Sequence, residues 1–132
     1  MTKYMIAHIG HTHRNCEHIT WWKPDSKGYT ICFDKAGRYS EAEAKSICQY
    51  GGCIAVEATK VETLVRSTPY YRRGDGNLCK LYDGGPHRPV PNEALAWRHL
   101  LNARLLCSKT TEKPTPIASS KARAIYLDVI HE

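Results

Sequence analysis

The fold is decided by a stretch near the N-terminus, residues 18–33, which reads HITWWKPDSKGYTICF. Its two ends, 18–23 and 29–33, are rich in aromatic and β-branched residues, which favour strands. Between them Pro24 fixes φ early in a turn, and Gly28 accepts a positive φ at the end of the turn. The stretch therefore predicts a β-hairpin. Because successive strand residues face opposite sides, one of Trp21 and Trp22 belongs to the core and the other to the surface.

The flanks of this hairpin add two strands and a helix. On the N-terminal side, KYMIAHI (3–9) is apolar and predicts a strand. On the C-terminal side, Ser40 and Glu43 have the spacing of a capping box, and the apolar stripe after them predicts a helix. The pair Gly51 and Gly52 ends that helix. CIAV (53–56) then predicts a short buried strand.

The second half of the chain is less regular. A second capping-box pattern at Thr59 and Glu62 predicts a short helix that ends before Pro69. The segment 70–91 is punctuated by glycine and proline and predicts one short strand at 78–82. Asn92 is a favourable N-cap for a third helix. We expect Trp97 to pack this helix on the sheet, within an apolar stripe formed by Leu95, Leu100, Leu101, Ala103 and Leu105.

This order of elements predicts an α+β fold, a small antiparallel sheet with two or three helices packed on it. Residues 1–107 form the single domain. The segment 108–121, SKTTEKPTPIASSK, has the composition of a flexible linker. The last segment, 122–132, is apolar enough to dock, either as an edge strand or as a short helix, and the sequence leaves that choice open.

Composition favours a protein of the cytoplasm. The chain has 132 residues, of which 42% are hydrophobic and 24% charged, as in a folded globular domain. No stretch approaches the roughly 20 apolar residues of a membrane helix. The six cysteines lie in apolar or amphipathic stretches where a small hydrophobic residue fits. We therefore expect reduced thiols rather than a disulfide framework.

The formal net charge of +6 makes an acidic partner plausible, either a nucleic acid or the acidic face of a protein, and excludes a mimic of DNA. Aromatic side chains interleaved with lysine and arginine suit both stacking on bases and anchoring a protein interface. The expected binding residues are Trp22, Lys23, Tyr70, Tyr71, Arg72, Arg73, Lys80 and Arg88. The alternative is that the tyrosines cap the core while the arginines solvate a loop.

The loop after the first strand is rich in histidine. His11, His13, Cys16 and His18 supply the imidazole nitrogens and the thiolate that zinc prefers, so zinc is a possible cofactor. No C-x2-C pair of a zinc knuckle accompanies them, and a solvated histidine-rich loop is the favoured interpretation.

The sequence contains no assembled catalytic motif. A nucleophile elbow, a P-loop, an H-E-x-x-H pair and a dinucleotide fingerprint are all missing from the chain. A cysteine and a histidine could pair as nucleophile and base, but six cysteines and seven histidines make coincidental pairs certain. The sequence therefore favours a binding or accessory protein over an enzyme.

Three stretches resemble small bacteriophage and prophage proteins of unassigned function: WKPDSKGYT (22–30), AGRYSEAEA (36–44) and VPNEALAWRHLL (90–101). The resemblance covers about a third of the chain and brings no catalytic residues. It implies a phage accessory protein in the cytoplasm of a bacterial host. Such proteins often act on host machinery, including bacterial immunity, so the expected function is binding of a host macromolecule, with inhibition of a host defence as its purpose. Nucleic-acid binding and a zinc-stabilised domain are the alternatives.

Overall fold

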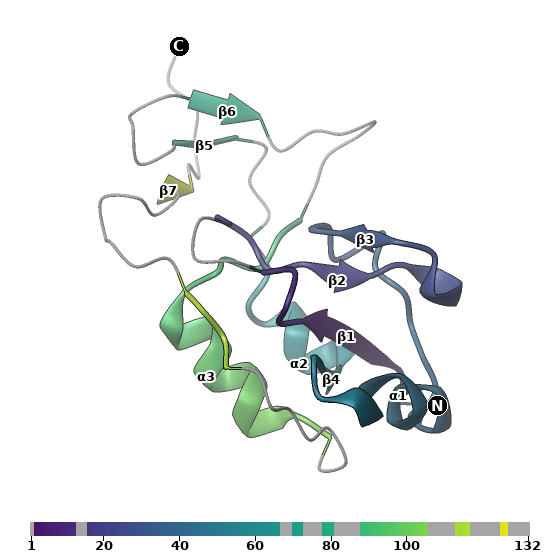
Figure 1. Cartoon of the computed structure of the whole chain (residues 1–132). Helices are drawn as coiled ribbons and strands as arrows, with labels where there is room; N and C mark the ends of the chain where they lie inside the picture. The colour runs from purple at the N-terminus through teal and green to yellow at the C-terminus, as the bar shows by residue number, and fades with distance from the viewer. Residues whose placement is uncertain are drawn as a thin grey trace.

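The computed structural model describes residues 2–12, 16–66, 70–72, 78–80, 88–105, 113–116 and 125–126. For residues 50, 70–72, 78–80 and 125–126 the description covers the backbone. The main sheet is antiparallel and has the strand order β3-β2-β1-β4. Its strands are β1 (Tyr4–His8), β2 (Trp21–Trp22), β3 (Tyr29–Thr30) and β4 (Cys53–Glu57). With the helices α1, α2 and α3, this confirms the predicted α+β fold (Figure 1).

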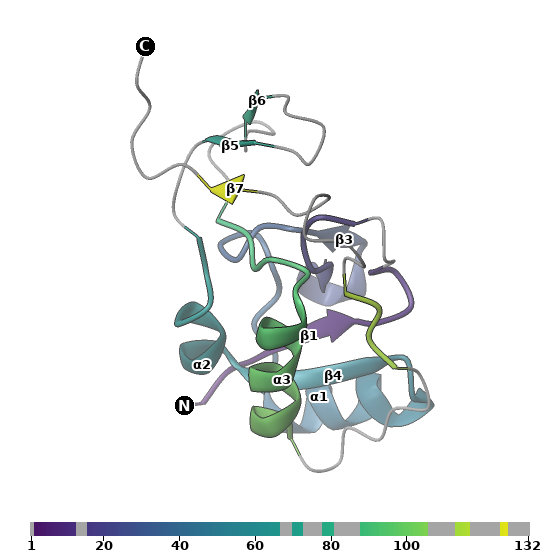
Figure 2. The same ribbon diagram turned by 90° about the vertical axis from the view of Figure 1, so that its left-hand side faces the viewer.

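Both faces of the central pair β1–β4 are covered. Met5 and Ala7 face a core shared with α2 and α3, whereas Ile6 faces a second core shared with α1. Strand β4 alternates in the same way, with Ile54 on the first side and Ala55 on the second. Figure 2 looks past α3 onto the sheet, with α1 behind it. Two-sided burial explains why both strands appear in the sequence as continuous apolar runs.

The predicted hairpin is confirmed. Trp21 pairs with Thr30 and Trp22 with Tyr29, and the Lys23 N–H donates to the Gly28 carbonyl at 2.8 Å. The turn contains the short 3-10 helix η1 (Pro24–Ser26), and Gly28 has a φ of 98°. Trp21 is fully buried and Trp22 is partly exposed, which gives the two tryptophans the opposite environments that alternation predicts.

The strands of this hairpin are shorter than the predicted 18–23 and 29–33. The cause is the segment 88–92, which pairs with the outer ends of both runs. His18 forms a β-bridge with Pro91, and the Ile19 N–H donates to the Val90 carbonyl at 2.9 Å. The Phe33 N–H donates to the Arg88 carbonyl at 2.8 Å. A distant segment thus replaces the local partner at this end of the hairpin.

Helix α1 (Glu41–Ile47) begins with the predicted capping box. The Glu43 N–H donates to the Ser40 hydroxyl at 3.2 Å, and the Ser40 N–H donates to the Glu43 carboxylate at 2.9 Å. The 3-10 turn η2 (Cys48–Tyr50) extends the helix to Gly51, whose φ of 89° ends it. The helix therefore begins and ends at the residues that the sequence indicates.

The second predicted capping box, at Thr59, is wrong. Helix α2 (Ala58–Glu62) begins two residues earlier than an N-cap at Thr59 would place it, and Glu57 precedes it without a side-chain cap. The Ala58 N–H instead donates to the Lys3 carbonyl at 2.9 Å. Main chain from the start of β1 therefore satisfies this donor at the helix start, so no capping side chain is required there.

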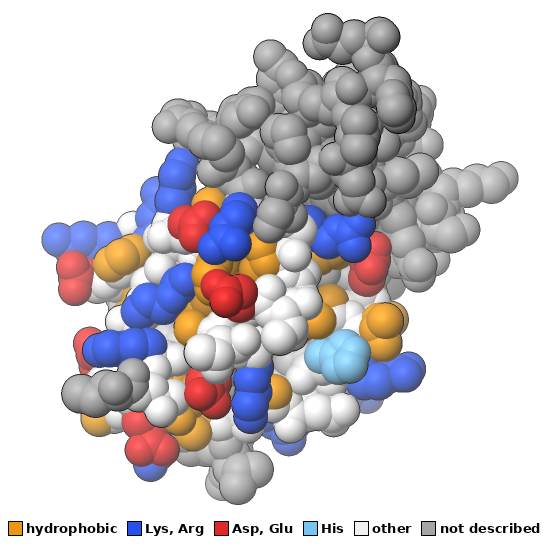
Figure 3. All heavy atoms as spheres, turned by 180° about the vertical axis from the view of Figure 1, so that it is seen from behind, with side chains coloured by type: hydrophobic (Ala, Val, Ile, Leu, Met, Phe, Trp, Pro, Cys, Tyr) orange, Lys and Arg blue, Asp and Glu red, His pale blue; other side chains and the backbone are white. Residues whose placement is uncertain are grey.

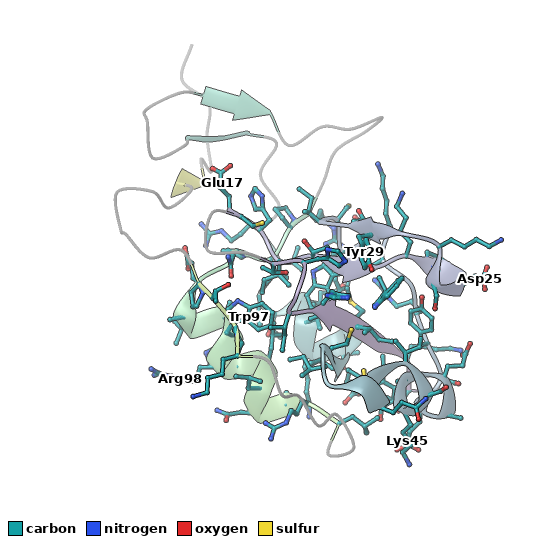
Figure 4. All side chains as sticks on the ribbon, in the orientation of Figure 1. Glu17, Asp25, Tyr29, Lys45, Trp97 and Arg98 are labelled. Atoms are coloured by element: carbon teal, nitrogen blue, oxygen red, sulfur yellow. The ribbon has the colours of Figure 1, made fainter. Side chains whose placement is uncertain are left out.

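Helix α3 (Ala94–Ala103) occupies the predicted place but starts and packs differently. Asn92 is not its N-cap, because Glu93 precedes the helix and Asn92 is fully buried. Leu95 is 58% exposed rather than part of the buried stripe. The buried residues are Ala96, Trp97 and Leu100, and Trp97 packs against the sheet as expected. In Figure 4, Trp97 points from α3 toward the sheet while Arg98 points outward.

A second antiparallel sheet has the order β6-β5-β7, with β5 (Tyr70–Arg72), β6 (Leu78–Lys80) and β7 (Ile125–Tyr126). It lies on the side of the molecule away from α1 in Figures 1 and 2. Strand β6 lies within the predicted 78–82, and β7 shows that the described part of the C-terminal segment is an edge strand. None of the helices in the described ranges has the length and apolar character that a membrane crossing requires.

Candidate binding surface

Four aromatic rings meet on one face of the main sheet, and we call them the aromatic patch: His8, His11, Trp22 and Tyr29. Tyr29 is central, with its ring centroid 4.4 Å from Trp22, 4.3 Å from His11 and 5.2 Å from His8. His8 lies 4.3 Å from His11 and 5.7 Å from Trp22. The rings are tilted or edge-on to one another, the arrangement that aromatic pairs prefer.

Strand geometry explains this gathering. His8 ends β1, and Trp22 and Tyr29 are directly opposed partners on β2 and β3. His8 shares its side of β1 with Ile6, the side that α1 covers further along the sheet. Tyr29 is 37% exposed, and Leu95 is the other exposed large hydrophobic residue in the described part of the chain. The patch is therefore the accessible continuation of a buried aromatic and aliphatic face.

Hydrogen bonds fix two of the rings. The His11 backbone N–H donates to His8 Nδ1 at 3.1 Å, so a neutral His8 carries its proton on Nε2. Trp22 Nε1 donates to the Cys53 sulfur on β4 at 3.4 Å. Fixed rings lose little conformational freedom when a partner binds them, which favours affinity.

Hydrogen bonds of the buried residue Thr12 anchor the histidine-rich loop that supplies His11. Thr12 is buried, and its hydroxyl donates to the His8 carbonyl at 2.9 Å and accepts from the Thr20 N–H at 3.0 Å. The Thr115 hydroxyl donates to the Thr12 carbonyl at 3.0 Å. Thr115 belongs to the described part, 113–116, of the segment whose composition predicts a linker. Thr115 therefore contributes directly to the packing of the loop.

Asn92 joins the same loop to helix α3. Its amide nitrogen donates to the carbonyls of Cys16 at 2.8 Å and Thr115 at 3.3 Å, and its oxygen accepts from Trp97 Nε1 at 2.7 Å. Its backbone N–H donates to the Glu17 carbonyl at 3.0 Å. We call Asn92 and these partners the Asn92 junction. The sequence carries no signal for it, because its partners are far apart in the chain.

The predicted binding residues fall into three places. Trp22 belongs to the aromatic patch, and exposed Lys23 follows it at the turn, near exposed Lys27. Tyr70, Tyr71 and Arg72 form β5, and Lys80 in β6 is the register partner of Tyr70. Arg73 lies outside the described residues. The structure thus places Trp22 and Lys23 together at the main sheet, and Tyr70 and Lys80 together in the second sheet. The sequence missed His8, His11 and Tyr29 as binding residues. Alternation along β1 gives no signal for His8, because it places His8 on the same side as the buried Ile6.

Arg88, the last predicted binding residue, has an intramolecular partner. Its Nε and Nη2 donate to the two Asp34 carboxylate oxygens at 2.8 and 2.7 Å. The hydrogen bonds from Arg88 lower the pKa of Asp34, and the same bonds raise the pKa of Arg88. The pair ties the loop after β3 to the segment 88–92. Arg88 therefore contributes to structure through Asp34 as well as to the surface charge.

The predicted zinc ligands are not brought together as a set of three among the residues that the structure describes. His11 lies in the aromatic patch and His18 is buried beside Pro91, while His13 lies outside the described residues. Cys16 donates weakly to the His11 carbonyl at 4.0 Å. Among the described cysteines, Cys16, Cys32, Cys48 and Cys53 are thiols rather than halves of a disulfide.

Charge on one face of the molecule, as far as the described residues show it, is mixed rather than concentrated. On the face seen from behind, lysine and arginine side chains are interspersed with aspartate and glutamate (Figure 3). This face lacks the uniform basic surface that binding along a phosphate backbone favours.

Comparison of the chain with protein-family models, with curated proteins and with solved structures found no match in any of the three.

Proposed function

We propose that this chain is a phage- or prophage-encoded accessory protein that binds a host protein through the aromatic patch, and that this binding inhibits a host defence. Two arguments support the proposal. The resemblance of three stretches to phage proteins supports the phage origin, and the accessible aromatic patch supports the binding of a protein. The proposal assigns no catalytic residues and makes the protein an inhibitor by contact.

The single observation that carries the proposal is the exposure of Tyr29 at the centre of four packed rings. Tyrosine and tryptophan are enriched among the residues that dominate protein interfaces. Here Tyr29 is 37% exposed and contacts His8, His11 and Trp22, so an anchor is preformed.

The test is capture of a host protein by the wild-type chain and by Tyr29→Ala. Loss of a central anchor costs about 2 kcal/mol, so we expect roughly 30-fold weaker binding to any specific partner. Leu95→Ala is the matched control, because Leu95 is also large, apolar and exposed but lies on α3, outside the patch. A partner that Tyr29→Ala and Leu95→Ala retain equally does not use the patch and contradicts the proposal.

Inhibition of a host defence has its own readout. We expect expression of the wild-type chain to raise phage plating on a bacterial strain that carries the relevant defence, and Tyr29→Ala to remove most of that gain. Equal protein levels of the two chains are the necessary control. If the chain binds a host protein but does not change plating on any defended strain, the binding proposal is supported and the inhibitory role is contradicted.

Nucleic-acid binding is the second candidate, and the lysines beside the patch favour it. Lys23 and Lys27 are exposed on the turn next to Trp22 and Tyr29. Binding of this kind depends on phosphates and weakens steeply with salt. Fluorescence polarisation with labelled single-stranded DNA and RNA at low salt tests it. Tight binding that falls with both salt and the change Lys23→Gln would replace the protein partner with a nucleic acid.

The zinc-stabilised domain is the third candidate and rests on the predicted ligands His11, His13, Cys16 and His18. Bound zinc would stabilise the folded state, so a chelator should lower the melting temperature. Metal analysis of protein purified without a histidine tag decides the question. Close to one equivalent of zinc, lost in Cys16→Ser, would support this candidate, and an unchanged melting temperature with chelator would reject it.

A further inference from the structure

Two arginines share one aromatic ring at the edge of the main sheet. The Arg38 guanidinium carbon lies 4.4 Å from the centroid of the Phe33 ring, and the Arg88 guanidinium carbon lies 5.0 Å from it. Phe33 itself is buried in the core. Contact with an aromatic face attracts a guanidinium and restricts its orientation. Both guanidinium carbons therefore lie within 5.0 Å of the centroid of one ring, and the positive charge of Arg88 acts on Arg38.

The two guanidinium groups differ in their hydrogen-bond partners. Arg88 is occupied by Asp34 through two bonds of 2.8 and 2.7 Å. Arg38 donates one bond, of 3.0 Å, to the Ala36 carbonyl, and forms no ion pair with a carboxylate of the described residues. A guanidinium has five N–H donors in a planar fork. The described residues thus accept a hydrogen bond from one of these donors of Arg38.

Partial burial makes such an acceptor more favourable. Arg38 is half-buried, and this desolvation lowers the pKa of its guanidinium, more than the nearby Asp34 carboxylate raises it. A charge that is partly removed from water and lacks a full partner gains from contact with an oxyanion. The hydrogen bonding of Arg38 and its burial therefore both favour the binding of an oxyanion.

We propose that Arg38, with Arg88 beside it, binds a carboxylate presented by an acidic segment of a partner protein. The Asp34–Arg88 pair shows that a carboxylate fits the guanidinium fork at this place. The net charge of +6 favours an acidic partner surface. The protein source of the carboxylate rests on the function proposed above, whereas the site itself is a property of Phe33, Arg38 and Arg88. Asp34 is the internal competitor for this site.

The experiment is an NMR titration of the full chain with a hexaglutamate peptide at low salt, following the arginine side-chain N–H signals. We expect the Arg38 signal to shift and Arg38→Gln to weaken binding by about tenfold, because charge-assisted pairs of this geometry are strong. Arg38→Lys keeps the charge but loses the planar fork, and should weaken binding nearly as much. Arg98→Gln on α3 is the matched control, since Arg98 is exposed, and it should leave binding unchanged.

Asp34→Asn gives the opposite expected result. It removes the internal competitor and frees the fork of Arg88, so the peptide should bind several-fold more tightly. Arg38→Lys and Asp34→Asn change single polar groups at a partly exposed place, and their melting curves establish that each remains folded.

Three outcomes would overturn the proposal. The first is equal loss of binding in Arg38→Gln and Arg98→Gln, which would indicate general charge attraction. The second is weaker rather than tighter binding in Asp34→Asn. The third is an Arg38 shift with inorganic phosphate but none with the peptide, which would replace the carboxylate with a phosphate. Tyr29→Ala should leave peptide binding intact, so failure of the aromatic patch and failure of this site are distinguishable.

Discussion

The loop between β1 and β2 is held at two places of opposite character. At the Asn92 junction, a fully buried amide satisfies carbonyls from two distant segments and the indole N–H of Trp97. At the aromatic patch, the same loop brings His11 against the rings of His8 on β1 and Tyr29 on β3. The buried contacts consist of directional hydrogen bonds whose loss leaves polar groups unpaired, whereas the exposed contacts leave aromatic surface for a partner. We therefore expect the first region to contribute mainly to stability, and we propose recognition for the second.

The largest expected effect on stability comes from breaking the junction. Asn92→Ala leaves the Trp97 indole N–H and the Cys16 carbonyl without their amide partner in the interior. Unpaired buried groups cost about 1–3 kcal/mol each, so we expect the free energy of unfolding to fall by about 3 kcal/mol. Urea denaturation followed by tryptophan fluorescence measures this change.

A second asparagine in the same region provides the control. Asn102 is exposed on α3, and Asn102→Ala should change the free energy of unfolding by less than about 0.5 kcal/mol.

Tyr29→Ala tests the aromatic patch in the same way. It should cost about 1 kcal/mol, the scale of an exposed aromatic contact, while it removes partner binding. If Tyr29→Ala destabilises the protein as much as Asn92→Ala does, the aromatic patch also contributes to stability, and the proposed difference between the two regions is contradicted.

The segment 113–116 gives an intermediate effect, because it contacts the junction and the loop together. Thr115→Val removes the hydroxyl that donates to the Thr12 carbonyl and keeps the shape of the side chain. One hydrogen bond at this partly exposed place contributes about 1 kcal/mol. We expect that loss in urea denaturation, together with faster hydrogen exchange of the Thr20 amide, which donates to the Thr12 hydroxyl. No change in either would show that 113–116 rests on the loop without holding it.

Much of the main sheet and of α1 could be predicted because their signals are local. The hairpin turn, the Ser40–Glu43 capping box and Gly51 act through residues that are neighbours in the chain. Alternation likewise distinguished buried Trp21 from partly exposed Trp22. Such features depend on backbone preferences and on residue spacing, which the sequence displays directly.

The incorrect predictions share a different cause, which is competition from segments that are distant in the chain. Asn92 is a favourable N-cap by type, yet its amide has better partners in Cys16 and Trp97. At the start of α2, the Lys3 carbonyl accepts the Ala58 N–H, so the helix begins before the Thr59 signal. The aromatic patch was missed for the same reason, since two of its rings come from the histidine-rich loop and β1 and meet Tyr29 only in the folded chain.

The smallest expected effect concerns the Asp34–Arg88 pair, which ties the loop after β3 to the segment that carries Asn92. Asp34→Asn should lower the free energy of unfolding by about 0.5 kcal/mol at pH 7, the scale of a solvent-exposed ion pair. Because Arg88 lowers the pKa of Asp34 in the folded state, the pair stabilises the protein fully above about pH 4 and loses its effect as the pH falls through the lowered pKa. The difference in stability between the wild type and Asp34→Asn should therefore be constant from pH 7 to about 5 and shrink in more acidic solution. Urea denaturation across this range checks the sign, and a difference that grows on acidification would mean that Asp34 is held protonated rather than ionised. The effect is small because the two side chains are accessible to solvent, Arg88 to 34% and Asp34 to 53%.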